Sequence, residues 1–107
     1  MESVKFKKSL NEQGQITGLE IGGMLVLQNS EQLQNEFISV FDVLSDQVKI
    51  TISEVDEIDL SCIQLFVAFI RRMDEIDVTY QFCWNIDEDQ KSLLENVGLS
   101  YELWMSN

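Results

Sequence analysis

Polar and apolar residues alternate through the opening of the chain. Residues 4–10 (VKFKKSL) and 16–23 (ITGLEIGG) both show the two-residue period of half-buried strands. The segment between them, 11–15 (NEQGQ), contains a turn-forming glycine. We therefore predict a β-hairpin, followed by a further short strand over the apolar residues 24–27 (MLVL).

After residue 30, apolar residues recur every three to four positions instead of every two. Asn29 or Ser30 can cap a helix at this point. Helical spacing is shown by Leu33, Phe37, Val40, Phe41 and Leu44. Alternation returns in residues 48–53 (VKITIS), with three β-branched apolar side chains on one face and polar ones on the other. We predict a strand in a sheet with only one face fully covered.

A second helix is predicted over residues 61–73, after an acidic loop. Its apolar side chains form a wide stripe that must lie on the sheet: Cys62, Ile63, Leu65, Phe66, Phe69, Ile70 and Met73. The opposite face is small or polar and contains Ser61, Gln64, Ala68, Arg71 and Arg72, with Glu75 beyond. Ser61 therefore stands at the N-terminal end of the face that a partner could contact.

The last third of the chain holds one more strand and one more helix. Residues 78–84 (VTYQFCW) alternate as a strand does. Asp87 and Gln90 have the spacing of a capping box, and Gly98 is placed to end the helix that they begin. Residues 101–104 (YELW) are predicted as a short strand or an extended tail. The order β-β-β-α-β-α-β-α predicts an α/β fold with a mixed sheet of four to five strands.

The chain is strongly acidic. Nineteen acids outweigh seven bases among the 107 residues, which gives a net charge of −12, and no run of bases is long enough to follow a phosphate backbone. Nucleic acids and anionic lipid surfaces would repel such a protein. A basic or neutral protein partner fits this charge, although a merely solvated acidic surface explains it equally well. Because no Gly-, Ser- or Pro-rich stretch divides the chain, we expect a single domain over residues 1–107.

Cysteine and histidine usage argues against a metal site. Cys62 and Cys83 lie apart among apolar neighbours, and the chain contains no histidine. We expect no zinc and no cofactor, and we interpret both cysteines as small buried hydrophobes in a reducing compartment. The longest apolar run, residues 65–70, is too short to cross a bilayer, and the N-terminus lacks the apolar core of a signal peptide. We expect a cytoplasmic protein without membrane insertion.

Four acids precede the second helix. Glu54, Asp56, Glu57 and Asp59 could gather a hard cation, but they lack the pattern of a calcium-binding loop, and solvated carboxylates are the commoner outcome. No His, Lys or Tyr accompanies them for general acid–base chemistry. We therefore expect no enzyme.

The hydroxyl of Ser61 has two interpretations. It can accept a hydrogen bond from a free backbone N–H in the first helical turn, a cap that contributes about 1 kcal/mol. Alternatively it is phosphorylated, which adds roughly −1.5 to −2 charge beside the positive end of the helix dipole and changes partner binding without unfolding the chain.

The sequence around this serine resembles the STAS family, the sulfate-transporter and anti-sigma-factor-antagonist domains. A strand and an acidic loop lead into Asp59-Leu60-Ser61-Cys62-Ile63, where the family reads Asp, Ser or Thr, Ser, Gly and Leu. The resemblance extends along nearly the whole chain. It includes Gly23 and Leu25 at the end of the second strand, Leu33 in the first helix, and residues 91–99 (KSLLENVGL) in the last helix.

The resemblance implies helices mainly on one face of the sheet and a partner surface at the start of the second helix. In the anti-sigma-antagonist branch it implies phosphorylation of Ser61 by a partner of the GHKL type that is both serine kinase and anti-sigma factor. Asp59 takes the place of the motif aspartate. The partner face would comprise Asp59, Leu60, Cys62, Gln64, Ala68 and Arg71.

Three residues depart from the family pattern. Leu60 replaces the first hydroxyl residue, Cys62 replaces a glycine, and Val26 stands where many members have an acid. A second hypothesis therefore makes the chain an accessory subunit that docks constitutively on the ATPase of a lipid ABC transporter, with Leu60 and Cys62 packed into that partner. Nucleotide or lipid binding is a third hypothesis, although the chain has no Gly-rich phosphate loop. Homodimer formation is left open.

Overall fold

The computed structural model describes residues 3–96, which form an α/β fold around one mixed sheet. The sheet has four strands in the order β1-β2-β3-β4: β1 (Val4–Leu10), β2 (Ile16–Leu25), β3 (Leu44–Ile58) and β4 (Thr79–Trp84). The first pair is antiparallel, and the two other pairs are parallel. The predicted fold class is confirmed, and so is the opening hairpin.

The hairpin turn between β1 and β2 is organised by one side chain. Asn11 Oδ1 accepts hydrogen bonds from the backbone N–H groups of Gln13 and Gln15, both at 2.9 Å. Gly14 has a φ of +78°, which other residues rarely adopt, and a Cβ atom there would meet nothing within 4 Å. The turn therefore projects into open space.

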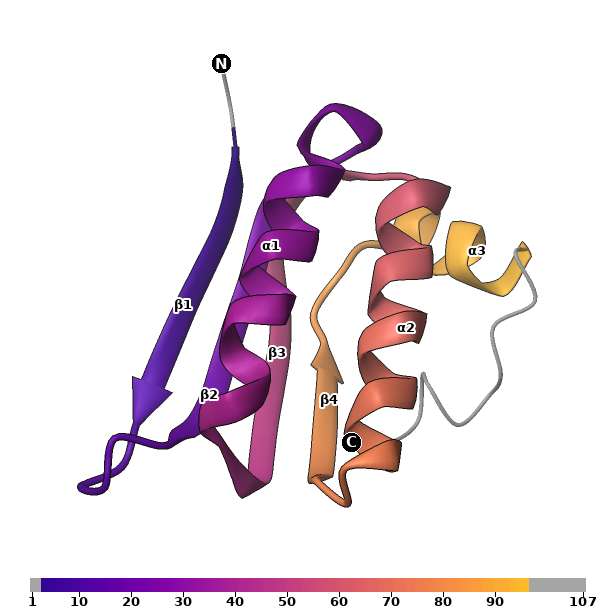
Figure 1. The fold of residues 1–107 in the computed structure, drawn as a ribbon. Coiled ribbons are helices and arrows are strands. Elements are labelled where there is room, and N and C mark those ends of the chain that lie inside the picture. Colours follow the sequence, from indigo (N-terminus) through magenta and orange to yellow (C-terminus); the bar gives the residue numbers. More distant parts are fainter. Residues whose placement is uncertain (1–2, 97–107) are drawn as a thin grey trace.

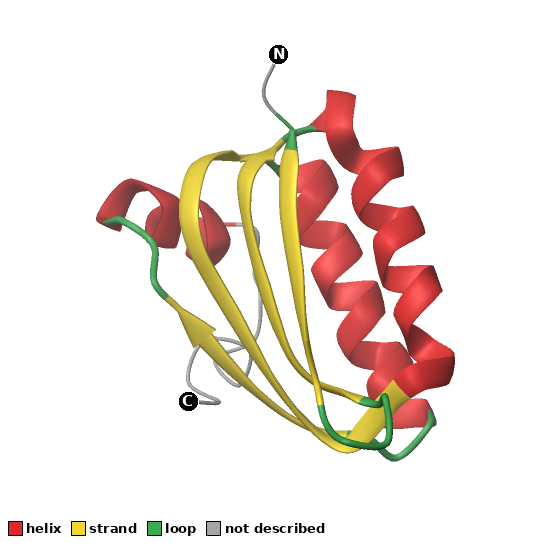
Figure 2. Ribbon diagram, turned by 90° about the vertical axis from the view of Figure 1, so that its left-hand side faces the viewer, coloured by secondary structure: helices red, strands yellow, loops and turns green. Residues whose placement is uncertain are grey.

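The helices follow the strands in alternation. They are α1 (Ser30–Val40), α2 (Leu60–Glu75) and α3 (Glu88–Asn96), with two 3-10 helices, η1 (Leu27–Asn29) and η2 (Phe41–Val43), before and after α1. Figure 2 shows α1 and α2 side by side on one face of the sheet, with α3 set apart from them. The expectation of helices mainly on one face is confirmed.

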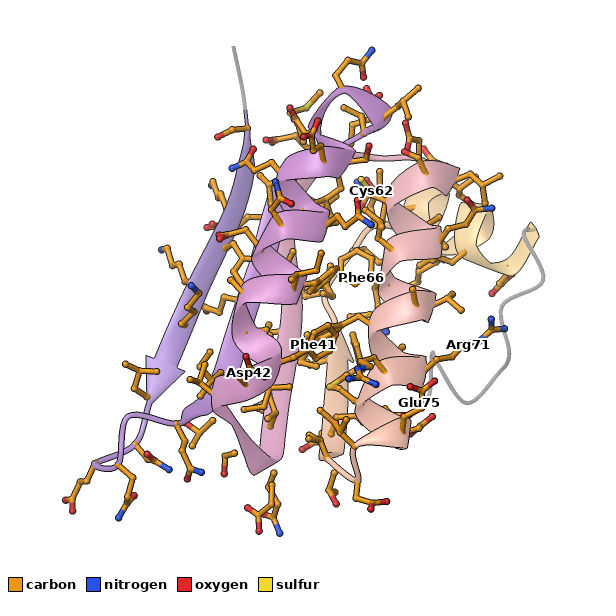
Figure 3. The ribbon with its side chains drawn as sticks, in the orientation of Figure 1. Phe41, Asp42, Cys62, Phe66, Arg71 and Glu75 are labelled. Carbon is orange, nitrogen blue, oxygen red and sulfur yellow. The ribbon has the colours of Figure 1, made fainter. Side chains whose placement is uncertain are left out.

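The core lies between the sheet and these two helices. Phe37 of α1 stacks on Phe69 of α2 with ring centroids 4.1 Å apart, and it meets Phe66 edge-on at 5.5 Å. Phe66 in turn packs against Trp84 of β4 at 5.7 Å. Figure 3 shows Phe66 directed into the space between the two helices. The six buried residues of α2, Cys62, Ile63, Phe66, Phe69, Ile70 and Met73, all belong to the predicted apolar stripe.

Two predicted element boundaries around the first helix are wrong. Residues 24–27 are not a separate strand, because β2 continues without a break and Leu25 pairs with Ile58 of β3. The continuation passes through a bulge at Gly23, whose φ is +84°. The first helix ends at Val40, so Phe41 and Leu44, predicted as helical, lie in η2 and at the start of β3.

The acidic segment before α2 is a strand and not a loop. β3 extends through Glu57 to Ile58 because it remains paired with β2 along this stretch. Val55 and Ile58 are the apolar residues in the stretch, and Ile58 is buried. Glu54 has a φ of +53° and introduces an irregularity that interrupts strict alternation.

The start of the third helix matches its prediction. Gln90 N donates to Asp87 Oδ1 at 2.8 Å, and Asp87 N donates back to Gln90 Oε1 at 3.3 Å, which is a complete capping box. Leu94 is fully buried in the core. The predicted helix end at Gly98 and the predicted strand at 101–104 lie outside the described residues.

Candidate functional site

The connections from the parallel strands to the helices that follow them all lie at one end of the molecule. The parallel strands β2, β3 and β4 all terminate there, and α1, α2 and α3 all begin there (Figure 1). In open sheets of this kind, the segments beyond the carboxyl ends of the strands are where binding groups gather. Ser61 lies at this end, in the first turn of α2.

Asp59, and not Ser61, caps helix α2. The helix begins at Leu60, one residue before the predicted start, and Asp59 precedes it in an extended conformation. Asp59 Oδ1 accepts hydrogen bonds from the backbone N–H groups of Ser61 at 3.1 Å and Cys62 at 3.4 Å. Ser61 Oγ also donates to Asp59 Oδ1. The capping interpretation of Ser61 is therefore wrong, because the neighbouring carboxylate already occupies the free N–H groups of the first turn.

The second oxygen of Asp59 binds a distant part of the chain. Asp59 Oδ2 accepts a hydrogen bond from Leu27 N at 2.9 Å, across 32 residues of sequence. Close by, Asp59 N donates to Leu25 O at 3.0 Å. We call the hydrogen bonds of the Asp59 carboxylate to Ser61, Cys62 and Leu27 the Asp59 clasp. It holds the connection between β2 and α1 against the start of α2.

The clasp stabilises the ionised form of its carboxylate. Burial by itself raises the pKa of Asp59. The hydrogen bonds from Ser61 Oγ and from the N–H groups of Leu27, Cys62 and Ser61 outweigh that effect and leave the pKa below its ordinary value. Asp59 is therefore a carboxylate at neutral pH and accepts hydrogen bonds without donating any.

Ser61 borders a groove between the two long helices. The groove has a volume of about 420 Å³ and is lined from α1 by Ser30 and Gln34 and from α2 by Ser61 and Gln64, among others. Ser61 itself is half-buried. A group that approaches along this groove reaches the serine without displacing any of the core residues.

The exposed face predicted for α2 is present. Gln64, Ala68 and Arg71 are all exposed. Arg71 lies ten residues beyond Ser61, which corresponds to about 15 Å along a helix. Figure 3 shows its side chain directed away from α1. Arg71 is therefore exposed but lies too far along α2 to neutralise charge next to the serine.

Cys62 does not belong to the partner face. Its side chain, labelled in Figure 3, is fully buried, and its Sγ atom donates to Val26 O at 3.6 Å. The expectation that Cys62 packs into a partner is therefore wrong, whereas its interpretation as a buried hydrophobe is confirmed. Burial, reinforced by the negative charge of Asp59, raises the pKa of Cys62 to about 11, so the thiol is protonated and unreactive at neutral pH.

Two exposed leucines flank the clasp. Leu60 is 46% exposed and Leu27 is 64% exposed. Leu60 was expected at the partner face, but Leu27 was predicted only as part of a strand. No pattern in the sequence relates these two residues, because the hydrogen bond from Leu27 N to Asp59 joins segments far apart in the chain. We call Leu27 and Leu60 the leucine pair.

The acids of β3 do not converge. Glu54, Asp56 and Glu57 are exposed, and Glu54 pairs with Lys5 of β1 at 3.3 Å. Within residues 3–96, no three potential metal ligands come together. The helices in this same range are too short or too polar to span a bilayer.

Comparison with known proteins gives one match. A search of curated proteins found no relative of this chain. A scan against family models matched the STAS domain over residues 7–107, which is nearly the whole sequence. Domains of this family generally serve as regulatory or protein-interaction modules and are generally not enzymes. The fold, with its four-stranded mixed sheet, agrees with the match, and the chain belongs to the STAS domain family.

Proposed function

We propose that this chain is a cytoplasmic, single-domain and non-enzymatic regulator that acts as an anti-sigma factor antagonist. In this proposal a partner that is both serine kinase and anti-sigma factor phosphorylates Ser61 and thereby ends its own binding to the chain. The observation that carries the proposal is the position of Ser61, at the exposed start of α2 and on the edge of the groove beside α1.

The geometry of the serine suits phosphoryl transfer. Ser61 Oγ would attack the γ-phosphorus of ATP, forming an Oγ–P bond while the bond from that phosphorus to the oxygen of departing ADP breaks. The hydroxyl proton would pass to a base of the kinase. Ser61 Oγ donates its hydrogen to Asp59 in the unmodified chain, so this hydrogen bond would break as the proton passes to the kinase and Oγ attacks phosphorus.

The departures from the family motif are compatible with this role. Cys62 replaces a glycine, but its side chain points into the core and leaves the approach to Ser61 open. Leu60 replaces a hydroxyl residue, and its partial exposure adds apolar surface beside the serine. Both features support contact with a partner at this end of α2.

Charge provides the switch in this proposal. The acidic chain would attract a partner with a neutral or basic contact surface. A phosphate on Ser61 adds roughly −1.5 to −2 charge, and no base of α2 lies closer to the serine than Arg71. No base of α2 lies within about two turns of the serine to neutralise the added charge, and that charge would weaken the contact.

Phosphorylation is tested by intact mass. The protein is incubated with its cognate kinase and ATP, and it is also recovered from growing cells. We expect one added phosphate on the wild type and none on Ser61→Ala. The matched control is Ser30→Ala, which alters the opposite side of the same groove and should still accept one phosphate. Absence of phosphate on the wild type under all conditions would refute the switch.

The leucine pair favours one alternative function. Exposed apolar side chains next to the serine suit a permanent contact, such as docking on the ATPase of a lipid ABC transporter. In that case Ser61→Glu would leave co-purification with the membrane ATPase intact, whereas Leu27→Ser together with Leu60→Ser would abolish it. The same leucine double variant would dissociate a homodimer built on this surface, which light scattering would detect.

A further inference from the structure

We propose that Asp59 transmits phosphorylation of Ser61 to the connection between β2 and α1. In this proposal the phosphate opens the Asp59 clasp, releases the Leu27 amide and changes the position of the leucine pair. The inference depends on the proposed phosphorylation only for its biological occurrence, because the coupling itself is built into the contacts of the unmodified chain.

One carboxylate serves both segments. Its Oδ1 atom is bound by the hydroxyl and N–H of Ser61, and its Oδ2 atom is bound by the N–H of Leu27. The two oxygens are rigidly joined, so a displacement of one moves the other. Asp59 thus contacts both the modified residue and the start of η1.

The neighbours of Leu27 have supports of their own. Asn29 N donates to Val26 O at 2.8 Å, and Asn29 Nδ2 donates to Met24 O at 2.9 Å. Asp59 N binds Leu25 O through the backbone and does not depend on the carboxylate. Leu27 O accepts hydrogen bonds from Ser30 N and, at 2.8 Å, from Ser30 Oγ, so the loss of the carboxylate contact should free the Leu27 N–H and leave β2 and α1 in place.

Phosphorylation removes the contact that Ser61 makes with Asp59. Transfer from ATP replaces the Oγ–H bond by an Oγ–P bond, with ADP as the leaving group and the proton passing to a base of the kinase. Ser61 Oγ then has no hydrogen to donate, and a dianion lies beside an ionised carboxylate. Like charges at this separation repel, and they repel more strongly where solvent is partly excluded.

The phosphate also competes for the donors that hold Asp59. The N–H groups of Ser61 and Cys62 lie at the positive end of α2 and attract the larger negative charge. Asp59 would lose these donors in addition to the hydroxyl. Both effects act in the same direction, away from the geometry that binds Leu27.

The first experiment measures amide exchange in chains that carry phosphoserine at position 61, introduced during translation. We expect exchange at the Leu27 amide to rise about tenfold or more relative to unmodified protein, because its acceptor is withdrawn. The matched control is the Gln90 amide, which is bound by the cap Asp87 of α3. Unchanged exchange at Leu27, or an equal rise at Gln90 from general destabilisation, would overturn the proposal.

A second variant tests whether Asp59 itself carries the effect. Asn has one accepting oxygen and no charge, so Asp59→Asn should keep the cap on α2 and remove the repulsion, while it lacks the second oxygen that binds the Leu27 N–H and so cuts the link between the two segments. Phosphoserine at position 61 should then raise Leu27 exchange by less than about threefold. A rise as large as in the wild type would mean that another route connects the two segments, and the proposal would fail.

Cys62 offers an independent readout. Its thiol lies beneath the same connection, bound to Val26 O. We expect neutral iodoacetamide to label Cys62 about tenfold faster in the phosphoserine protein. Added negative charge alone would raise the thiol pKa and slow the reaction, so acceleration reports access. The half-buried Cys83 is the internal control, and equal labelling rates of Cys62 in both proteins would count against opening.

The two proposals can fail separately. If no kinase modifies Ser61 in cells but inserted phosphoserine opens the clasp, the proposed function is refuted and the coupling stands. If Ser61 is phosphorylated in cells and the Leu27 amide does not respond, the switch acts by charge alone and the coupling is refuted.

Discussion

Two helices in this fold begin with an aspartate cap, and the two caps differ in reach. Asp87 exchanges hydrogen bonds with Gln90 and closes a capping box within the first turn of α3. Asp59 caps α2 and in addition binds Leu27, which lies 32 residues earlier. The Asp87 carboxylate binds within its own helix, whereas the Asp59 carboxylate joins the start of α2 to the connection between β2 and α1.

The two caps therefore have different roles: Asp87 stabilises its own helix, whereas Asp59 also holds part of the surface in position. A local cap can be lost with little effect beyond its own helix. Loss of the Asp59 clasp would also leave the Leu27 amide without its acceptor and would free the leucine pair. The consequences should differ in both size and location.

Replacement of Asp59, the cap that also binds Leu27, should have the largest effect on stability. We expect Asp59→Ala to lower the free energy of unfolding by about 2–3 kcal/mol, because it removes a helix cap and a charged acceptor of several N–H groups at once. Urea unfolding monitored by Trp fluorescence measures this loss. A loss no larger than that of Asp87→Ala would show that the contact with Leu27 contributes nothing.

Replacement of the local cap should have a smaller effect. For Asp87→Ala we expect a loss of about 1 kcal/mol, confined to α3. Amide exchange shows where the effect is located: we expect faster exchange at the Gln90 amide and unchanged exchange at the Leu27 amide. Faster exchange at both amides would mean that the two caps are coupled.

Because Asp59 is charged, its contribution to stability should depend on pH. The pKa of Asp59 is lowered in the folded chain, so its contribution is fully present above the unfolded pKa of about 3.9 and is lost as the pH falls through the folded value. Asp59→Asn should be less stable than wild type by about 1 kcal/mol at pH 7, and the difference should shrink below pH 4.

Urea titrations at several pH values measure this dependence. Gln90→Ala is a suitable control because it removes the hydrogen bonds of Gln90 to Asp87 N and Val55 O without removing a titratable group. Its difference from wild type should stay constant across the same range. A constant difference for Asp59→Asn as well would contradict the stabilised carboxylate.

The hydroxyl of Ser61 should contribute least. Ser61→Ala removes one hydrogen bond to Asp59 but leaves both backbone donors in place, and alanine favours the helix. We expect a loss of no more than about 0.5 kcal/mol and an unchanged Leu27 amide. A loss comparable to that of Asp59→Ala would assign Ser61 a structural role that competes with phosphorylation.

The two caps also show what sequence reasoning can reach. The Asp87–Gln90 box was predicted because its partners are three residues apart and face each other in any helix. The Asp59 contact was not predicted, because its partner is a backbone N–H that only the folded sheet brings near. At the start of α2 the sequence contains two residues that could cap the helix, Asp59 and Ser61. Only one of them can serve as the main cap, and the sequence does not show which.

Apolar periodicity was reliable where one face is buried. It placed the stripe of α2 correctly, since Phe66 and Phe69 must meet Phe37 whatever the exact ends of the helices. It failed at the end of β3, where bulges near Glu54 interrupt alternation while pairing with β2 continues. The exposed position of Leu27 was also missed, because an apolar residue at the end of a strand gives no sign of which way it faces.

The hairpin turn at residues 11–15 lies at the opposite end of the sheet from the start of α2 (Figure 1). Because a side chain at Gly14 would meet no neighbouring atom, a short peptide inserted there would have room outside the fold. Such an insertion could attach the protein to a sensor surface or carry a fluorophore. Partner kinetics could then be recorded on immobilised chains with the serine-bearing end facing the solvent.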